Sequence, residues 1–339
     1  MAIVLRVVRN LFAPRWGYSK LSRRPVQICF AVLLLLQFSS SGLAQESRKV
    51  RLAYSALSIS FLNVFIARDA GLFKKHGIDP ELIQMAGPLP VAALTAGEID
   101  FLTGYTTGIV ATGRGAPLKG IMVSLRKPPF YLIAGPSLQK PIEIVGKRIG
   151  VDRIGSLQHL VARLLLKTKG IDSEKVLFTQ TGSVSNTVTS LGQSAVSAAV
   201  LSAPHNVIMT QKGFRQIGAA DDLPVQFPTS GLVVSDAKLR ADINVIKNVI
   251  RAMLDANAFS LREKNWVTQY VRDKWQIEQK AAETVYEQWR AILTPEGRLA
   301  VKDMQESFDI AYAQKQIAAP VNVAAVTDFS LLEQVLAGK

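Results

Sequence analysis

Apolar and polar positions follow a repeated order along the chain from about residue 50 to about residue 235. Short apolar runs lead into polar loops rich in Ser, Thr and Gly, and these loops lead into segments with apolar residues at helical spacing. The clearest unit, Arg51 to Ile83, reads as strand, polar loop, helix, turn and strand. Within it, Ser60 is the expected N-cap of the helix and Gly71 its expected C-cap.

The units form two successive cycles, which predicts an α/β fold with two mostly parallel sheets flanked by helices. The expected strands are Arg51–Tyr54, Pro80–Met85, Ile99–Thr103, Pro117–Val123, Phe130–Ala134, Gly146–Val151, Val176–Gln180, Ala198–Leu201, Phe214–Ile217 and Ser230–Val234. The expected helices are Phe61–Ala70, Pro90–Ala96, a helix that runs to about Arg114, Leu157–Thr168, a weak helix through Val188 and Leu191, and His205–Gln211. Leu94–Phe101 aligns without gaps with Leu191–Ala198, so the second cycle repeats the architecture of the first, with Ser197 in place of Asp100.

Two proline-marked segments interrupt the cycles, at Lys127–Pro129 and Asp222–Thr229. Proline suits a crossing between domains better than a strand interior, and two crossings between two similar domains make a hinge. The expected division is a leader at 1–44, a first lobe at 45–127 plus 230–339, and a second lobe at 128–229.

The region after the second crossing is expected to be helical. The expected helices are Asp236–Arg262 with a break near Asp242, Ala281–Leu293, Pro295–Ala311 and Leu331–Leu336. Trp266, Trp275 and Trp289 in this region are interpreted as packing anchors.

The first 44 residues have six basic residues, no acidic residue, an apolar stretch at Val26–Phe38 and small residues before Gln45. This pattern predicts a secretory signal peptide cleaved after about Ala44. A membrane anchor is the rival interpretation, but the apolar stretch is shorter than the roughly 20 residues that span a bilayer. Arg23 and Arg24 hint at twin-arginine export, which the following Pro25 disfavours, so the export route stays open.

Composition narrows the chemistry that the chain can perform. The only cysteine, Cys29, lies in the leader, so the mature chain has no disulfide, thiolate nucleophile or cysteine-ligated metal. Removing the leader lowers the formal net charge from +14 to +8, which favours anionic ligands only weakly because the basic residues are scattered. No basic run interleaved with aromatic residues predicts nucleic-acid binding, and no cofactor is expected.

The sequence contains no catalytic or nucleotide-binding motif of the common kinds, and its three histidines are widely spaced. Hydroxyl-rich loops between strands and helices remain, where side-chain hydroxyls and free N–H groups can bind polar ligands. Helix capping is the plainer interpretation of each loop taken alone. The candidate ligand-binding residues in these loops are Ser55, Leu57, Ser58, Ser60, Phe61, Asn63, Gly104, Tyr105, Thr106, Arg153, Gly155, Ser156, Ser202, Ala203 and Pro204.

Three segments carry a resemblance to a known family: Gly71–Ile78, Leu94–Phe101 and the Gly146–Val151 strand before Gly155-Ser156. Together they resemble the nitrate, sulfonate and taurine branch of ABC-transporter substrate-binding proteins. The resemblance covers nearly all of the mature chain. It implies a periplasmic binding protein type II fold whose two lobes close on a small molecule, with first-lobe loops around Ser55–Phe61 and Gly104–Thr106 facing second-lobe loops.

The sequence departs from that family pattern at two positions. The second lobe has Ser197 where an acidic residue is usual, and the loop Asp152–Gly155 lacks an Arg directly before Gly-Ser. Pyrimidine synthases of thiamine biosynthesis look similar around Gly71–Ile78, but they use a cysteine-rich iron site, which this mature chain cannot build.

The sequence therefore predicts a periplasmic, monomeric solute-binding protein that delivers a small organic molecule, a sulfonate, carboxylate or heterocycle, to a membrane permease of an ABC importer. A ligand-sensing domain or an exported enzyme with the same fold is the alternative. Loop composition leaves the ligand unidentified.

Overall fold

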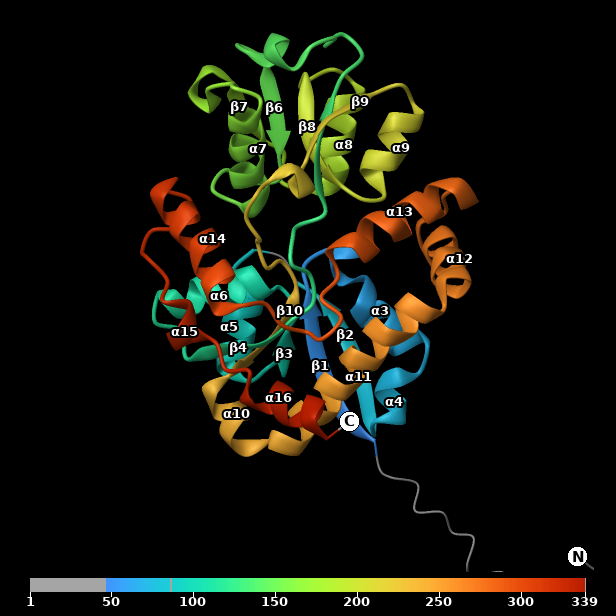
Figure 1. Ribbon diagram of the computed structural model, residues 1–339, viewed down its shortest axis with the longest axis vertical. Coiled ribbons are helices and arrows are strands. Elements are labelled where there is room, and N and C mark those ends of the chain that lie inside the picture. Colours follow the sequence, from blue (N-terminus) through green and yellow to red (C-terminus); the bar gives the residue numbers. More distant parts are fainter. Residues whose placement is uncertain (1–46, 86, 339) are drawn as a thin grey trace, which may run out of the picture. The chain divides into compact units, whose positions relative to one another are not determined.

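The computed structural model describes residues 47–85 and 87–338, which contain two five-stranded mixed sheets (Figure 1). Sheet 1 has the order β2-β1-β3-β10-β4 and sheet 2 the order β7-β6-β8-β5-β9. The strands of sheet 1 are β1 (Arg48–Tyr54), β2 (Ile78–Gln84), β3 (Phe101–Leu102), β4 (Leu118–Val123) and β10 (Gly231–Ser235). Those of sheet 2 are β5 (Phe130–Ala134), β6 (Arg148–Val151), β7 (Leu177–Gln180), β8 (Ala198–Ser202) and β9 (Arg215–Ala219).

The two sheets have the same topology, which confirms the predicted two-cycle α/β fold. In sheet 1, β1 pairs in parallel with β2 and β3, while β10 runs antiparallel between β3 and β4. In sheet 2, β6 pairs in parallel with β7 and β8, while β5 runs antiparallel between β8 and β9. Each reversed strand is the first to follow a crossing from the other sheet, so it enters its sheet from the opposite end.

The predicted internal repeat is visible residue by residue at the start of β3 and of β8. The N–H of Asp100 donates to the carbonyl of Arg51 at 2.9 Å, and the N–H of Ser197 donates to that of Arg148 at 2.9 Å. Gly97 and Ser194, which are also aligned, both have left-handed backbone conformations, with φ of 77° and 59°. The repeat is therefore a repeat of backbone geometry.

The helices follow most of the sequence expectations. The helices between strands are η2 (Ile59–Phe61), α3 (Leu62–Asp69), α4 (Leu72–Lys75), α5 (Leu89–Ala96), α6 (Tyr105–Gly113), η3 (Pro141–Ile144), α7 (Leu157–Thr168), η4 (Ser173–Lys175), α8 (Val184–Gly192), α9 (His205–Gln211) and η5 (Ala220–Asp222). Those after β10 are α10 (Asp236–Ala241), α11 (Ile243–Arg262), α12 (Lys264–Trp275), α13 (Gln279–Ile292), α14 (Val301–Ala313), α15 (Val323–Val326) and α16 (Ser330–Ala337). The break predicted near Asp242 separates α10 from α11.

Several local predictions are wrong. Ser60 does not cap α3: it lies inside η2, whose N-cap is Ser58, and α3 begins after Phe61 without a side-chain cap. The predicted turn after Gly71 contains the short helix α4, and α12, in the region expected to be helical, was not predicted as a separate helix. The helix expected to begin at Pro295 begins at Val301, and α15 lies outside the helices that the sequence predicts.

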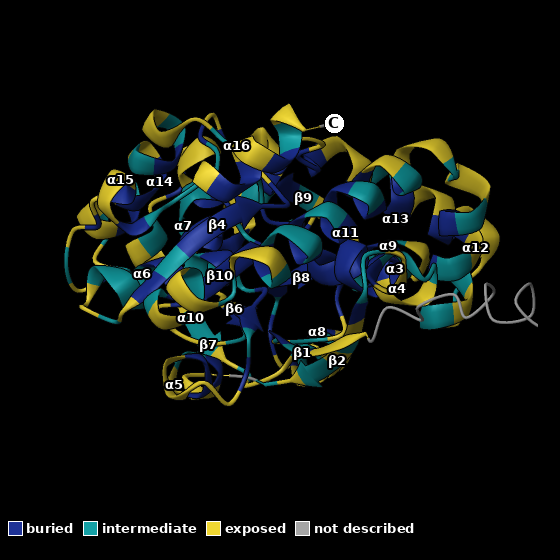
Figure 2. Ribbon diagram, turned by 90° about the horizontal axis from the view of Figure 1, so that it is seen from below, coloured by how far each residue is buried: buried dark blue, intermediate teal, exposed yellow. Residues whose placement is uncertain are grey.

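The central strands form the interior of the described part, the edge strands β2 and β7 are only partly buried, and the helices expose their outer faces (Figure 2). Tyr105 and Trp289 are among the largest fully buried side chains, which confirms Trp289 as a packing anchor. The Tyr105 ring lies against the backbone of β4, where a Cβ added at Gly120 would be 2.7 Å from the ring. Glycine is needed at position 120 because of this close approach.

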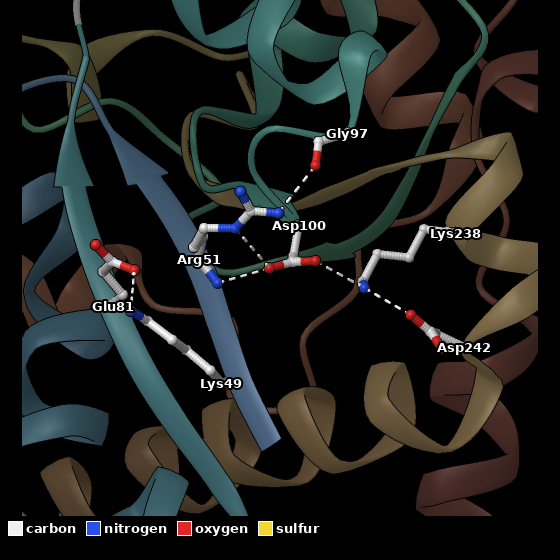
Figure 3. Close-up of polar contacts among 7 residues, drawn as sticks. All are labelled: Lys49, Arg51, Glu81, Gly97, Asp100, Lys238 and Asp242. Carbon is white, nitrogen blue, oxygen red and sulfur yellow. Dashed lines mark hydrogen bonds and ion pairs between the residues drawn. The ribbon is translucent and has the colours of Figure 1, made fainter. Parts of the chain in front are cut away.

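An ion-pair cluster fixes the start of β3 to α10 (Figure 3). The Asp100 carboxylate accepts hydrogen bonds from the Arg51 N–H at 2.7 Å and from Lys238 Nζ at 2.8 Å, and Lys238 also pairs with Asp242 at 2.8 Å. Burial opposes ionisation of Asp100, but these bonds outweigh it and hold the pKa of the carboxyl below its usual value. The equivalent residue of sheet 2, Ser197, carries no charge and cannot form such an ion pair.

The run Gly71–Ile78, which carries part of the family resemblance, attaches α4 to α11. Lys75 Nζ and His76 Nε2 lie 2.7 Å and 2.9 Å from the Asp255 carboxylate. Burial again opposes ionisation, and the hydrogen bonds from Lys75 and His76 outweigh it, so the pKa of Asp255 is lowered. This run stabilises the packing of α4 on α11.

The two crossings run side by side. The Thr229 N–H donates to the Leu125 carbonyl at 3.1 Å, and the Ser124 N–H donates to the Ser230 carbonyl at 2.7 Å. Lys127 Nζ donates to the backbone carbonyls of Asp221 and Leu223 at 2.8 Å and 2.9 Å. The connection between the sheets is thus a bonded pair of segments.

None of the helices within residues 47–85 and 87–338 has the length and apolar character to cross a bilayer. The predicted signal peptide and its cleavage site lie outside the described residues.

Candidate functional site

The candidate loops lie at the carboxyl edges of the parallel strands, the edge at which open α/β sheets bind ligands. In sheet 1, the loops after β1 and β3 are neighbours because these strands pair Leu52 with Phe101 and Ala53 with Leu102. In sheet 2, the loops after β6 and β8 are neighbours for the same reason. The sequence therefore brings the predicted residues together in two groups, one on each sheet.

The loop after β1 is held by its own serines. The Ser60 N–H donates to Ser58 Oγ at 3.2 Å, and the Ser58 hydroxyl lies 3.3 Å from Ser60 Oγ. Ser55 is exposed, and the Leu57 side chain is 45% exposed although its carbonyl accepts a hydrogen bond from Trp275 Nε1 at 3.5 Å. Ser55 and Leu57 are the accessible side chains of this loop.

Three candidate residues on the sheet 1 side point into the interior. Phe61 packs at a tilt against Tyr54, with ring centroids 6.2 Å apart. Asn63 is 1% exposed, and its amide donates to Asn257 Oδ1 at 3.4 Å. Tyr105 is fully buried with its hydroxyl 3.8 Å from Met304 Sδ, and burial raises its pKa far above the usual value.

Gly104 and Thr106, on either side of Tyr105, remain at the sheet edge and are half-buried. The Thr106 hydroxyl donates to the carbonyl of Pro228, and the Tyr105 N–H donates to that of Thr229 at 3.1 Å. These bonds fix the loop after β3 to the second crossing, so movement of the crossing would move this loop.

The loop after β6 differs from an open anion site because side chains of the protein already accept hydrogen bonds from its backbone N–H groups. The N–H groups of Asp152, Arg153, Ile154 and Gly155 donate, in that order, to Gln158 Oε1, Asp152 Oδ1, Gln180 Oε1 and His159 Nδ1 at 3.0, 2.7, 3.1 and 3.1 Å. The Ser156 hydroxyl, at the N-cap of α7, donates to Asp152 Oδ1 at 2.5 Å. A carboxylate of the protein thus lies where an anionic ligand would bind.

The same loop exposes one charged and one apolar side chain, Arg153 and Ile154, the latter 48% exposed. His159, just inside α7, lies edge-on to Phe178 at 4.4 Å between ring centroids. Burial and the charge of Arg163 lower the pKa of His159, which favours its neutral form.

The candidate residues at the end of β8 and just after it are buried. Ser202, Ala203 and Pro204 lead into α9, and Ala203 belongs to the core cluster that surrounds Trp289. Burial lowers the pKa of the following residue, His205, below its usual value, although a hydrogen bond to the Ser202 backbone opposes this effect. This segment provides backbone and small side chains.

Helix α13 connects the two groups of loops. It contacts η2 on the sheet 1 side and α9 on the sheet 2 side. Asn206, in the first turn of α9, donates from its amide to Gln288 Oε1 at 3.3 Å. The end of α13 is bonded in turn to the first crossing, since the Arg126 N–H donates to the Ile292 carbonyl at 2.9 Å.

The described residues contain no group of three or more His, Cys, Asp and Glu side chains arranged to hold a metal ion. The three histidines have separate environments: His76 pairs with Asp255, His159 with the loop after β6, and His205 begins α9.

Sequence reasoning missed four residues near these loops: Ser124, Ser230, Asn206 and Trp289, whose indole was interpreted only as a packing group. Each is almost fully buried, and each has a side-chain polar atom without a hydrogen-bond partner among the described residues. The available signal was position along the chain: Ser124 follows a predicted strand, Ser230 begins one, and Asn206 lies in the first turn of a predicted helix.

A family model described as NMT1/THI5 like matches residues 58–264. Proteins of Brucella abortus and Brucella suis that are named as binding proteins are 32% identical to this chain over 149 residues. That match covers 43% of this chain and 46% of theirs, so the chain spans about half the length of these curated relatives.

Solved structures share the fold at low sequence identity. The alkanesulfonate-binding protein SsuA from Xanthomonas axonopodis pv. citri, bound to MOPS, is 18% identical with a TM-score of 0.71, over 84% of this chain and 99% of that one. SsuA from Escherichia coli, an aliphatic sulphonate-binding protein, is 18% identical with a TM-score of 0.68, over 85% and 99%. The desulfurization enzyme DSZB is 12% identical with a TM-score of 0.66, over 86% and 99%, so this fold also occurs in an enzyme.

Proposed function

Because the chain belongs to the NMT1/THI5-like family, we propose that it is an exported solute-binding protein of an ABC importer. It captures a small organic molecule in the periplasm and delivers it to a membrane permease. The structural similarity to sulfonate-binding proteins supports this function through the shared fold.

The observation that carries the proposal is the pair of sheets with one topology, joined by two bonded crossings. We assign sheet 1 with residues 45–127 and 230–339 to one lobe and sheet 2 with residues 128–229 to the other. Ligand capture then changes the angle between the lobes at the crossings, and the ligand stabilises the closed arrangement by contacting both.

Within the candidate set, the accessible residues contact the ligand and the buried ones position them. Ser55, Leu57, Arg153 and Gly155 supply accessible contacts, while Asn63 and Tyr105 hold the loops of sheet 1. The exposed Leu57 and Ile154 give one apolar contact from each lobe, which suits a ligand with an organic part.

The first experiment is native mass spectrometry of the protein as purified from the periplasm, to identify a molecule that remains bound. The identified molecule is then added back during thermal unfolding and small-angle X-ray scattering. At 100 times its dissociation constant it should stabilise the fold by about 2.7 kcal/mol and reduce the radius of gyration. Stabilisation without any compaction would contradict the closure step.

A matched pair of arginine variants tests the site. Arg153→Ala, at the carboxyl end of β6, should weaken binding of the carried-over molecule, whereas Arg148→Ala, at the other end of the same strand, should leave it unchanged. Equal effects of the two substitutions would place the ligand elsewhere.

The shared fold of DSZB favours an exported enzyme as the second candidate function. Purified protein is incubated with biphenyl-2-sulfinic acid, the compound bound in a DSZB structure, and with the carried-over molecule, and chromatography follows both. If both compounds remain unchanged after prolonged incubation with a large amount of protein, binding alone is supported. A product that forms only when the protein is present supports the enzyme.

A further inference from the structure

Four almost fully buried residues near the junction of the two sheets have a polar side-chain atom that no described residue satisfies. They are Ser124 and Ser230, both 1% exposed, Asn206 at 1% and Trp289 at 0%; the atoms are the two Oγ atoms, Oδ1 and Nε1. An unsatisfied buried polar atom is unfavourable, so four of them in one region call for a physical reason.

Hydrogen bonds link Ser124, Ser230 and Asn206 to α13 or to the residues just after it, and Trp289 lies in α13. Ser124 and Ser230 lie at the carboxyl edge of sheet 1, where the Ser124 N–H donates to the Ser230 carbonyl at 2.7 Å. The Ser124 carbonyl accepts from the Thr294 N–H, at the end of α13, at 2.9 Å. Asn206 reaches the same helix from sheet 2 through Gln288, the residue before Trp289.

The chemistry of these atoms indicates what they can bind. The indole N–H only donates, the amide Oδ1 only accepts, and each serine hydroxyl does both. None of the four carries a charge. A partner that satisfies all of them must offer both acceptors and donors, as an amide, urea or lactam group does.

Apart from Arg153, whose side chain is exposed, the charged groups nearby do not favour an anion. The cationic side chains of the first crossing are committed, Arg126 to the Ala291 carbonyl and Lys127 to the carbonyls of Asp221 and Leu223. At the start of α7, the Asp152 carboxylate already accepts from the Arg153 N–H and the Ser156 hydroxyl. An anion at that helix start would have to displace this carboxylate.

We propose that Ser124, Ser230, Asn206 and Trp289 form the polar recognition group of the binding site, and that the ligand is an uncharged molecule with an amide, urea or lactam group. This inference rests on the proposed solute-binding function and specifies the class of solute. Sulfonates and carboxylates bind more weakly than neutral molecules of the same shape.

The test compares neutral and anionic probes of similar size: benzamide and hydantoin against benzoate and benzenesulfonate, by isothermal titration calorimetry and thermal shift. Benzamide or hydantoin should bind at least tenfold more tightly than the two anions. Tighter binding of an anion overturns this inference and leaves the solute-binding function in place. Absence of binding by all four probes, together with no carried-over molecule, counts against both.

Variants separate recognition from a purely structural role because the two roles predict opposite signs. Ser124→Ala and Ser230→Ala remove a buried hydroxyl that no described residue satisfies, so the melting temperature without probe should stay the same or rise, while affinity for the bound neutral probe falls about tenfold. The control is Ser307→Ala, whose equally buried hydroxyl donates to the Met304 carbonyl at 2.7 Å, and which should keep full affinity. A lower melting temperature with unchanged affinity in both variants would overturn the assignment.

Trp289→Phe provides an independent check, since it removes the indole N–H and keeps an aromatic ring. It should weaken binding of the neutral probe more than Trp266→Phe does. The Trp266 ring lies outside the recognition group and stacks on Tyr270 with centroids 5.1 Å apart. Equal affinities in the two variants would remove Trp289 from the group.

Discussion

Alanine at Gly120 tests whether Tyr105 is a core residue of sheet 1 or a mobile part of the site. A Cβ at this position would lie 2.7 Å from Ile109 Cδ1 and 2.7 Å from Tyr105 Cε2. Both neighbours are fully buried, and the tyrosine hydroxyl contacts Met304. Neither side chain can move away without disturbing others.

The magnitude follows from two opposing effects. Overpacking a buried site by one methyl group costs about 1–3 kcal/mol, and replacing glycine inside a strand recovers about 0.5–1 kcal/mol of backbone entropy. We therefore expect Gly120→Ala to lower the free energy of unfolding by about 0–2.5 kcal/mol, with a central value of about 1 kcal/mol. The measurement is urea unfolding of the chain without its predicted leader, followed by circular dichroism.

Gly192→Ala is the matched control, because this glycine lies in α8 and an added Cβ would meet no atom within 4 Å. It should raise stability by about 0.5–1 kcal/mol. In the double variant Gly120→Ala/Tyr105→Leu, the smaller side chain at position 105 should relieve the clash. The coupling energy between the two substitutions should therefore be favourable by about 0.5 kcal/mol or more. If Gly120→Ala is as stable as the parent chain and shows no coupling, Tyr105 is free to move and its assignment to the core is wrong.

Three further outcomes are expected. Asp100→Asn should cost about 1.5–3 kcal/mol at neutral pH, because Lys238 loses a charged hydrogen-bond partner. The pKa of Asp100 is lowered in the fold. The stability that Asp100 contributes is therefore present above the unfolded-state pKa of about 4 and is lost as pH falls through the folded-state pKa. The free energies of unfolding of variant and parent should converge in acid, and a difference that stays constant with pH would contradict this linkage. Asp255→Asn should behave in the same way, since the pKa of Asp255 is lowered as well, and Lys75→Met should reproduce only part of its loss because His76 remains. Asn206→Ser, which removes the amide bonded to Gln288, should change ligand affinity and the scattering profile together, whereas an effect on melting temperature alone would limit this bond to a structural role.

The sequence was sufficient to predict the fold class because the pattern of apolar and polar positions indicates which segments form strands and which form helices. The helices Leu157–Thr168 and His205–Gln211 and the strand Phe130–Ala134 were predicted with the bounds that the structure has. The reversed direction of β5 and β10 could not be read from the pattern, since a buried strand has the same composition in either direction. Helix α12 was missed because charged and polar residues separate its aromatic side chains, although Trp266 and Tyr270 stack at the i,i+4 spacing of a helix.

The candidate site was less predictable than the fold because hydroxyl-rich loops do not reveal where their side chains point. Asn63 and Tyr105 face the interior, which depends on the partners Asn257 and Met304 that lie about 200 residues away in the sequence. Likewise, only the structure shows that Asp152 accepts the hydrogen bonds of its own loop. Local sequence specifies a cap or a turn, and long-range packing decides whether a side chain is accessible.

The position of β10 has a consequence for synthesis of the chain. Sheet 2 is contiguous in sequence, from Phe130 to Ala219, whereas sheet 1 receives its fourth-placed strand, β10, only after all of sheet 2 has been made. Until then β3 and β4 each present an unpaired edge in what becomes the middle of a sheet, and such edges pair readily with other chains. During translation, the half of the molecule that emerges first is therefore the half whose sheet is completed last.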